Sequence, residues 1–210
     1  MSATLTDLAK KLNLAARDRW HLNSEALLPP LVLMTDEKRL PEPVLAIKNL
    51  PSGSAVIYRH YGLADREGFG RHLRQAAFEA DVLFLVAGDH ALAQSLEADG
   101  THMPENLAFR LEGSPPFERA DGKKSFNTIA VHSHQALERA AASGVNAALL
   151  SPVFATKSHP GSEPLGATKA NIWGAQSALP VYALGGISPS NALALKEGAF
   201  AGLAAIDALS

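Results

Sequence analysis

Four histidines stand at or just beyond the ends of short apolar runs, where their side chains could transfer protons or bind a metal ion. They are His60, His102, His132 and His134. Histidine is suited to proton transfer because its ordinary pKa lies close to neutral pH. A zinc-dependent hydrolase is one interpretation, although the sequence lacks a tight ligand spacing such as HExxH. The alternative is that each histidine only makes local hydrogen bonds.

The segment SPVFATKSHPG, residues 151–161, could form a loop that holds an anion. It follows the apolar run VNAALL and contains Thr156, Ser158 and His159 together with a lysine. Hydroxyl and imidazole groups can donate hydrogen bonds to phosphate oxygens. The segment therefore predicts part of a phosphate-binding site rather than a linker.

A second segment with this potential is ALGGISPSN, residues 183–191. Gly185 and Gly186 precede a predicted helix that starts near Ser188 and ends at Gly198. The N–H groups of glycines can approach an oxyanion without obstruction by a Cβ, and a helix N-terminus favours negative charge. The alternative interpretation is that the two glycines only form a tight turn.

The last apolar run, GLAAID, would complete such a phosphate site. The amide of Gly202 is expected to face the phosphate. Asp207 complicates this interpretation, because a carboxylate beside a phosphate repels it unless the carboxylate points away.

The composition narrows the classes of partner and of chemistry. The chain has 210 residues, 47% of them hydrophobic, and a formal net charge of −2 at pH 7. This size suits one domain, and the dispersed charge disfavours nucleic acid or an anionic membrane surface as a partner. The sequence has no cysteine, which excludes disulfides and thiolate ligands. Without a signal-peptide pattern or an apolar run near ~20 residues, we expect a soluble cytoplasmic protein that binds a small molecule.

Short apolar runs alternate along the chain with helix-like stretches such as DREGFGRHLRQAAFEA and HQALERAAAS. Runs rich in valine, isoleucine and leucine are typical of parallel strands whose two faces are both covered. Alternation with helices predicts right-handed parallel crossovers, and eight such units favour a closed (β/α)8 TIM barrel over an open sheet. The predicted strands span residues 31–35, 55–60, 82–87, 100–103, 128–132, 146–151, 181–186 and 200–206.

The two ends of the chain refine this barrel prediction. Only a few residues follow the last predicted strand, so the last helix must be very short or absent. The amphipathic stretch at residues 5–22 could cover the gap. We therefore expect residues 1–25 to form an N-terminal helix packed on a barrel of residues 26–210. Reactive side chains in such a barrel lie at the carboxyl ends of the strands, where the βα loops converge.

Several stretches, in order and spacing, resemble the thiamine phosphate synthase and TenI family over residues 30–209. LVLMTD resembles the family's LYLVTD, and ADGTHMPE resembles ADGVHLGQ. VHSH resembles VSxH after the fifth strand, and SPVFATKSHPGSEPLG resembles GPxFxTxTKxxxxxxG. YALGGISPSN with GAFAGLAAI resembles the closing AIGGIxxxN and GAxGVAVIS.

The resemblance implies a (β/α)8 barrel with one of two activities. The synthase branch of the family joins a pyrimidine diphosphate to a thiazole phosphate, releases pyrophosphate and uses magnesium. The TenI branch handles the thiazole phosphate alone and includes a tautomerase of the thiazole carboxylate phosphate. Both branches need a phosphate site, but only the synthase needs a magnesium pyrophosphate site.

The sequence departs from the family's motifs at the residues expected to bind the pyrimidine and the magnesium pyrophosphate. Arg59 matches the arginine of the family's QLREK, but Ile57 replaces the glutamine and Tyr61 replaces the lysine. Gly88 stands where the family's NDR has its aspartate. Asp89 and Glu105 are the possible substitutes for the metal-binding acids, so magnesium is expected only if the synthase interpretation holds.

The residues expected to bind the thiazole phosphate depart less from the family's motifs. The resemblance assigns phosphate binding to Thr156, Ser158, His159, Gly185, Gly186 and Gly202. Through the same resemblance His134 matches the family histidine after the fifth strand, and a histidine beside a thiazole ring could move a proton between carbon atoms. The predicted catalytic residues are His134, His132, Arg59 and His60.

These observations favour a TenI-like protein that binds, and could isomerise, a thiazole phosphate. A genuine synthase is the alternative, and a non-catalytic binder of phosphorylated ligands is the second alternative. The expected partner is a small phosphorylated heterocycle, with neither nucleic acid nor membrane involved, and family members commonly associate into homo-oligomers.

Overall fold

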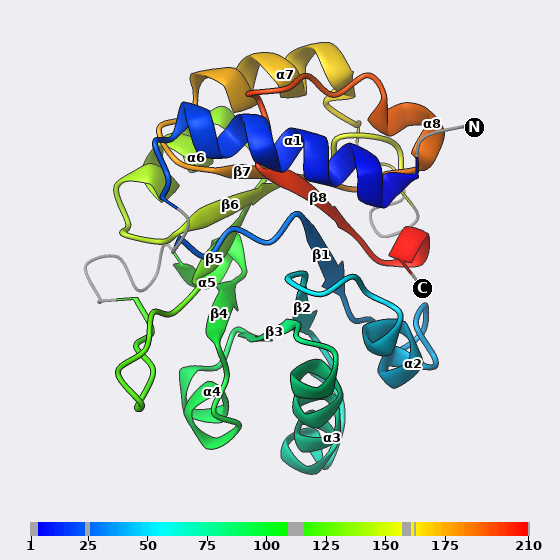
Figure 1. Cartoon of the computed structure of the whole chain (residues 1–210), viewed down its shortest axis with the longest axis vertical. Coiled ribbons are helices and arrows are strands. Elements are labelled where there is room, and N and C mark those ends of the chain that lie inside the picture. Colours follow the sequence, from blue (N-terminus) through cyan, green and yellow to red (C-terminus); the bar gives the residue numbers. More distant parts are fainter. Residues whose placement is uncertain (1–3, 24–25, 109–115, 157–160, 162, 210) are drawn as a thin grey trace.

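The computed structural model describes residues 4–23, 26–108, 116–156, 161 and 163–209. Eight parallel strands follow one another in sequence order and close into a barrel, because β1 pairs with both β2 and β8. This confirms the predicted (β/α)8 barrel (Figure 1). The strands are β1 Leu31–Met34, β2 Ala55–Tyr58, β3 Leu83–Ala87, β4 Gly100–Met103, β5 Thr128–Val131, β6 Ala147–Leu150, β7 Val181–Leu184 and β8 Gly202–Ala205.

The strands are short and almost wholly buried, which explains their continuous apolar sequences. Every residue of β1, β2, β6 and β8 is buried. Both faces of each strand are covered, one by the side chains inside the barrel and the other by helices, so neither face favours polar residues. The lack of polar and apolar alternation in the sequence follows from this burial.

Helices connect the strands and form the outer layer. They are α1 Leu5–Arg19, α2 Pro43–Lys48, α3 Arg66–Glu79, α4 His90–Ser95, α5 Glu105–Ala108, α6 His134–Ala141, α7 Gly166–Gln176 and α8 Pro189–Ala192, and the 3-10 turn η1 spans Asp207–Leu209. Side-chain caps fix several starts. Asp65 accepts a hydrogen bond from the Gly68 amide, and Ser133 accepts one from the Ala136 amide.

The helix α1 packs on the barrel beside β8 and β1, where Figure 1 shows it lying across β8. The buried side chain of Asn13 ties it there, because its Nδ2 donates to the carbonyl oxygens of Leu28 and Ala201, each at 2.9 Å. After β8 the described chain forms only η1. The predicted N-terminal helix and very short last helix are therefore both present.

One predicted helix is much shorter than expected. Residues 188–198 were predicted to be helical, but α8 ends at Ala192. Asn171 of α7 accounts for this difference, because its Nδ2 donates to the Ala194 carbonyl and its Oδ1 accepts from the Lys196 amide. A side chain from a neighbouring helix thus binds the backbone groups that a longer helix would have used.

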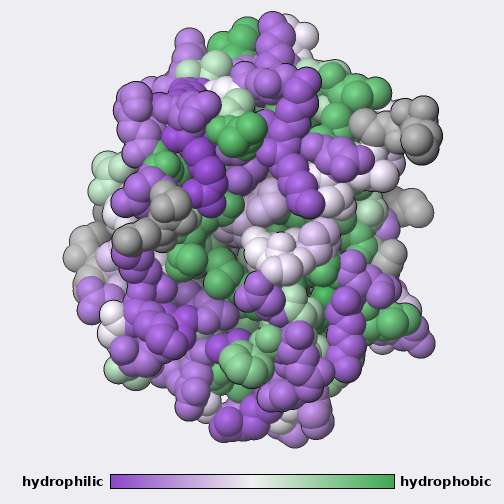
Figure 2. All heavy atoms as spheres, in the orientation of Figure 1, coloured by the Kyte–Doolittle hydropathy of each residue, from purple (hydrophilic) through white to green (hydrophobic). Residues whose placement is uncertain are grey.

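The molecular surface is mixed in polarity. Figure 2 shows hydrophilic side chains interspersed with smaller groups of apolar ones on the face seen in Figure 1. Within the described ranges, no helix combines the length and the apolar character needed to cross a membrane.

Candidate functional site

A small pocket lies at the carboxyl ends of β7 and β8, on the rim where the sequence predicts phosphate binding. Its volume is about 60 Å³, enough for roughly two water molecules at about 30 Å³ each. The described residues that line it are Arg39, Thr156, Leu184, Gly185, Gly186, Ile187, Ala205, Ile206, Asp207 and Ala208.

Glycine is required at both positions of the β7 loop. Gly185 and Gly186 have φ values of 95° and 61°, in the left-handed region. A Cβ on Gly186 would stand 2.2 Å from the Ala155 carbonyl oxygen, so the loops after β6 and β7 touch through this residue. The glycines thus serve the tight turn, which is the alternative weighed for them, and also allow close approach of the backbone.

The pocket offers backbone donors. Among the described residues, no turn or loop hydrogen bond uses the amides of Gly186, Ile187 and Ala208. Asn191 anchors the turn from behind, because its Nδ2 donates to the Gly186 carbonyl at 2.7 Å. N–H groups without a protein acceptor, gathered at one pocket, suit an oxyanion. Since α8 has only four residues, a helix dipole adds little here.

The orientation of Asp207 is settled by Arg39 of the β1 loop. Arg39 Nε donates to Asp207 Oδ1 at 3.0 Å, and Arg39 Nη2 donates to Asp207 Oδ2 at 2.5 Å. The carboxylate is thus held by a guanidinium that lines the same pocket. Its negative charge is compensated locally, which reduces the repulsion expected for a phosphate.

Gly202 is a correction to the predicted phosphate site. It is the first residue of β8, and a Cβ there would stand 2.2 Å from the Pro30 carbonyl oxygen just before β1. It therefore lies at the amino-terminal end of the barrel, opposite the pocket. The GLAAID segment contributes through its last residues instead. Ser158 and His159 lie outside the described residues.

The two histidines after β5 have different surroundings. His132 Nδ1 lies 2.8 Å from the Ser151 carbonyl oxygen at the end of β6, and the His132 amide donates to Glu105 Oε2 at 2.7 Å. His134 begins α6, with its ring 5.5 Å from that of Trp173 on α7. His132 thus faces the barrel rim, whereas the described contacts of His134 lie in the helical layer.

His102 of β4 is a candidate that the predicted catalytic set left out. It is 3% exposed, and its Nδ1 lies 2.9 Å from Thr128 Oγ1 on β5. Burial, together with the charges of Arg59 and His132, lowers the pKa of His102 to about 3. His102 is therefore a neutral imidazole coupled to two predicted catalytic residues. The sequence could have pointed to His102, because it stands inside the fourth predicted strand, three residues before Glu105.

Arg59 and His60 follow β2 but differ in environment. The Arg59 amide donates to Thr35 Oγ1 at 2.9 Å, and the guanidinium acts electrostatically on His102 and Tyr61. His60 is 4% exposed, and its ring packs against Phe69 of α3, with a centroid distance of 5.2 Å. Burial lowers the pKa of His60. The charge of Arg59 thus acts on His102, whereas the His60 ring contacts Thr35 and Phe69.

The residues on the magnesium side do not fit a magnesium pyrophosphate site. Asp89 caps α4 through the Leu92 amide and pairs with Arg66 at 3.4 Å. Glu105 Oε2 accepts from the His132 amide.

Gly88, at the position of the family aspartate, supports the same conclusion. Its φ is 69°, so any other residue would be strained there. A Cβ at this position would stand 3.6 Å from Tyr61 Cε1, so the side chain that replaces the family lysine occupies the neighbouring space.

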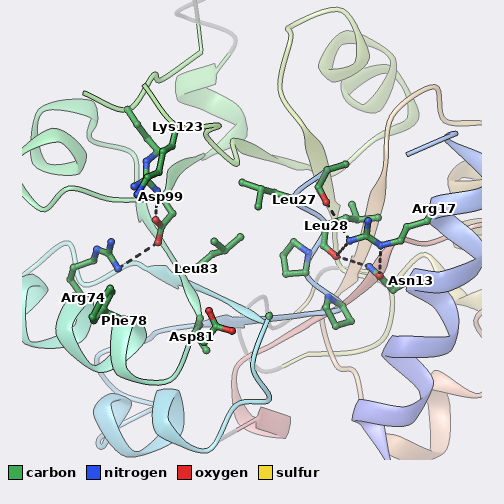
Figure 3. Close-up of a pocket in the computed structure, with 16 residues that line it drawn as sticks. Asn13, Arg17, Leu27, Leu28, Arg74, Phe78, Asp81, Leu83, Asp99 and Lys123 are labelled. Atoms are coloured by element: carbon green, nitrogen blue, oxygen red, sulfur yellow. Dashed lines mark hydrogen bonds and ion pairs between the residues drawn. The ribbon is translucent and has the colours of Figure 1, made fainter. Parts of the chain in front are cut away.

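A larger cavity of about 620 Å³ lies at the opposite, amino-terminal end of the strands (Figure 3). Several of its charged groups are bound by other protein groups. Asp99 pairs with Arg74 at 3.6 Å and with Arg119, and Arg17 donates to backbone carbonyl groups of residues 23–28. These contacts hold the α1–β1 segment and the β4–β5 loop. We therefore take the carboxyl ends of the strands as the location of the candidate site.

Comparison with known proteins gives a consistent family. The model of the thiamine monophosphate synthase family matches residues 31–209. The chain is 31% identical over 167 residues to the putative thiamine-phosphate synthase 2 of Aquifex aeolicus, covering 77% of this chain and 87% of that protein. It is 25% identical over 193 residues to the thiamine-phosphate synthase of Bacillus velezensis, covering 88% and 84% of the two chains.

Solved structures give the same architecture. The thiamine phosphate pyrophosphorylase of Pyrococcus furiosus superposes with a TM-score of 0.67 at 23% identity, covering 88% of both chains. FabK of Thermotoga maritima superposes with a TM-score of 0.59 at 13% identity, covering 92% of this chain and 61% of that one. At these identities the likenesses show the fold alone.

Proposed function

The chain belongs to the thiamine monophosphate synthase family, a family of thiamine biosynthesis, and on that premise we propose that it is a TenI-like protein that binds and isomerises a thiazole phosphate. The phosphate group would bind in the pocket between the loops after β6, β7 and β8. The heterocycle would extend from there into the mouth of the barrel, toward His132, His102 and Arg59.

One contrast supports this proposal over a full synthase. The pocket at β7 and β8 keeps backbone amides that no described turn or loop hydrogen bond uses. On the other side, Asp89 and Glu105 are bonded to protein groups, and Gly88 replaces the family aspartate. A ligand with one phosphate needs only the first half of this arrangement, whereas a magnesium pyrophosphate needs well-placed carboxylates as well.

His132 is proposed to carry the proton. The Ser151 carbonyl oxygen beside Nδ1 can only accept a hydrogen bond, so Nδ1 of the neutral ring holds the hydrogen and Nε2 is the basic nitrogen. Nε2 would take a proton from one carbon of the thiazole ring system and return it at another. The substrate then loses and regains one proton, with no net change in the protein. Positioned acid–base catalysis of this kind contributes about 100- to 10,000-fold.

The remaining site residues would bind and orient the ligand. Thr156 and the amides of the β7 and β8 loops are proposed to bind phosphate oxygens. Arg59, which acts electrostatically on His102, would place positive charge near the ring. His102 stays neutral near physiological pH, so it would fill the wall of the mouth as an uncharged polar group.

The alternative is a genuine thiamine phosphate synthase, and the names of the relatives favour it. Both the Aquifex and the Bacillus proteins are named as thiamine-phosphate synthases. A synthase with this sequence would need magnesium ligands other than those of the family pattern.

A pair of assays separates these functions. The purified chain would be given the thiazole carboxylate phosphate tautomer in one assay, and thiazole phosphate with a pyrimidine diphosphate and magnesium in the other. The proposal predicts conversion of the tautomer, lost in His132→Gln, with no thiamine phosphate formed. Formation of thiamine phosphate would establish the synthase, and tight binding of thiazole phosphate without turnover in either assay would establish a non-catalytic binder.

A further inference from the structure

The pocket at β7 and β8 contains a pair of opposite charges that bind each other. Arg39 and Asp207 are the charged residues among the described residues that line it. They meet edge to edge, with Nε on Oδ1 and Nη2 on Oδ2. Any anion that enters the pocket therefore meets a guanidinium whose Nε–Nη2 edge already binds a carboxylate.

The backbone of Arg39 is fixed independently of Asp207. Asp36 Oδ1 accepts from the amides of Lys38 and Arg39 at 3.1 and 3.0 Å, and the Asp36 carbonyl accepts from the Leu40 amide at 3.0 Å. This turn after β1 presents Arg39 to the pocket. Loss of the ion pair would thus leave the guanidinium within reach of the same place.

The two sides of the pair differ in exposure. The Arg39 side chain is 24% exposed, whereas that of Asp207 is 51% exposed. The carboxylate can therefore turn into water at little cost, because half of it is already solvated. The Nε–Nη2 edge of a guanidinium fits two phosphate oxygens as well as it fits two carboxylate oxygens.

We propose that Asp207 is a counter-anion of the phosphate pocket, which holds Arg39 before the ligand binds and yields the Arg39 edge to the phosphate. This inference rests on the proposed phosphate pocket. Each phosphate that binds replaces one anion by another, so the chain holds phosphorylated ligands more weakly than it would with a neutral residue at position 207. A weaker hold on the phosphate also favours release of the product.

The test is the affinity for inorganic phosphate and for thiazole phosphate, measured by isothermal titration on four variants. Asp207→Asn removes the competing carboxylate, so its affinity should rise about fivefold, as expected for one unit charge about 4 Å away in water. Arg39→Gln removes the cation, so its affinity should fall by a similar factor. If the ion pair only stabilised the loops, the two variants would not change the phosphate affinity in opposite directions.

Controls come from the Lys48–Glu79 pair, whose groups are 3.2 Å apart and each about half exposed. Glu79→Gln and Lys48→Gln change the net charge as the two pocket variants do, but away from the pocket. Their affinities should stay within about twofold of the unmodified chain, because salt screens charges beyond about 10 Å. Thermal melting would confirm folding, with Asp207→Ser as the second variant if Asp207→Asn melts early.

The outcomes separate this inference from the proposed function. If the unmodified chain binds thiazole phosphate and Asp207→Asn binds it equally or more weakly, the counter-anion role is overturned while the phosphate pocket stands. If neither the unmodified chain nor any variant binds phosphate or thiazole phosphate, the proposed pocket is wrong, and the inference is lost with it.

Discussion

His132 and His134 are two residues apart, yet the boundary between β5 and α6 gives them different neighbours. β5 ends at Val131, Ser133 caps α6, and His134 is its first residue. His132 therefore stays on the rim beside Ser151, while His134 lies beside Trp173 in the helical layer. The resemblance assigned the family histidine to His134, but the geometry favours His132 for proton transfer.

Replacing each histidine by glutamine separates the two assignments. We expect His132→Gln to lower tautomerase turnover by about 100-fold or more, because the proton acceptor is lost. His134→Gln should remain within about threefold of the unmodified chain, since its contacts lie outside the barrel mouth. Turnover would be followed by the absorbance of the thiazole product. The opposite ranking of the two variants would return the catalytic role to His134.

His102 combines burial with positive neighbours, and this combination has a consequence for stability. Burial, with the charges of Arg59 and His132, lowers its pKa to about 3 in the folded chain, against about 6.5 in an unfolded one. Between these values the unfolded chain binds a proton that the folded chain does not. The free energy of unfolding therefore rises with pH across this window and falls on acidification.

A urea-denaturation series from pH 7.5 to 4 tests this consequence. In His102→Gln the pH dependence of the unfolding free energy should decrease by about one proton below pH 6.5. Above pH 7 the two slopes should coincide, because both forms of His102 are then neutral, and this range is the internal control. Equal slopes in both ranges would show that His102 titrates normally in the folded chain.

At the scale of elements, α1 occupies the side of the barrel that the short η1 leaves uncovered after β8. Its buried side chains Leu5, Ala9, Leu12 and Ala16 face the barrel at helical spacing. Asn13 fixes the position of the helix on this apolar surface, because its side-chain amide donates to the backbone carbonyls of Leu28 and Ala201, just before β1 and β8.

Truncating Asn13 should therefore destabilise the whole barrel. We expect Asn13→Ala to lower the unfolding free energy by about 1–3 kcal/mol, because the carbonyls of Leu28 and Ala201 lose the hydrogen bonds that Asn13 donates. Leu14→Ala is the control on the same helix, since Leu14 is 68% exposed, and it should change stability by no more than about 0.5 kcal/mol. Urea midpoints measure both. Equal midpoints for the two variants would mean that Asn13 does not anchor α1.

The strands could be predicted from the sequence because a strand buried on both faces is a continuous apolar run between turns, which is a local pattern. The length of α8 is not set by a local pattern. Asn171 of α7 ends that helix by binding the backbone at Ala194 and Lys196, a contact between residues more than twenty positions apart. Local helix propensity was overridden by a tertiary hydrogen bond.

The candidate site was predictable in part for the same reason. Two consecutive glycines in the β7 loop predict a backbone conformation that other residues rarely adopt. In the structure both glycines have a positive φ. Gly202 was assigned wrongly because it is the first residue of β8, so its amide lies at the amino-terminal end of the barrel, away from the pocket. Arg39 was missed because Asp207, its partner, lies 168 residues away.

At the scale of the whole molecule, the two halves of the barrel rim differ in how many residues match the family's motifs. The loops after β1, β6, β7 and β8 surround a pocket with backbone donors and a guanidinium. The loops after β3 and β4 carry acids that cap α4 or bind the β5 backbone. This asymmetry suits a ligand with one phosphate and a ring, and it leaves a magnesium pyrophosphate without its usual carboxylates.

The most direct test of this asymmetry is isothermal titration of the purified chain with thiazole phosphate, and then with a pyrimidine diphosphate analogue plus magnesium. We predict saturable binding of thiazole phosphate, weakened in Thr156→Ala, and no binding of the pyrimidine diphosphate analogue with or without magnesium. Tight, magnesium-dependent binding of the pyrimidine diphosphate analogue would contradict the account, because it would mean that carboxylates outside the family pattern complete a synthase site.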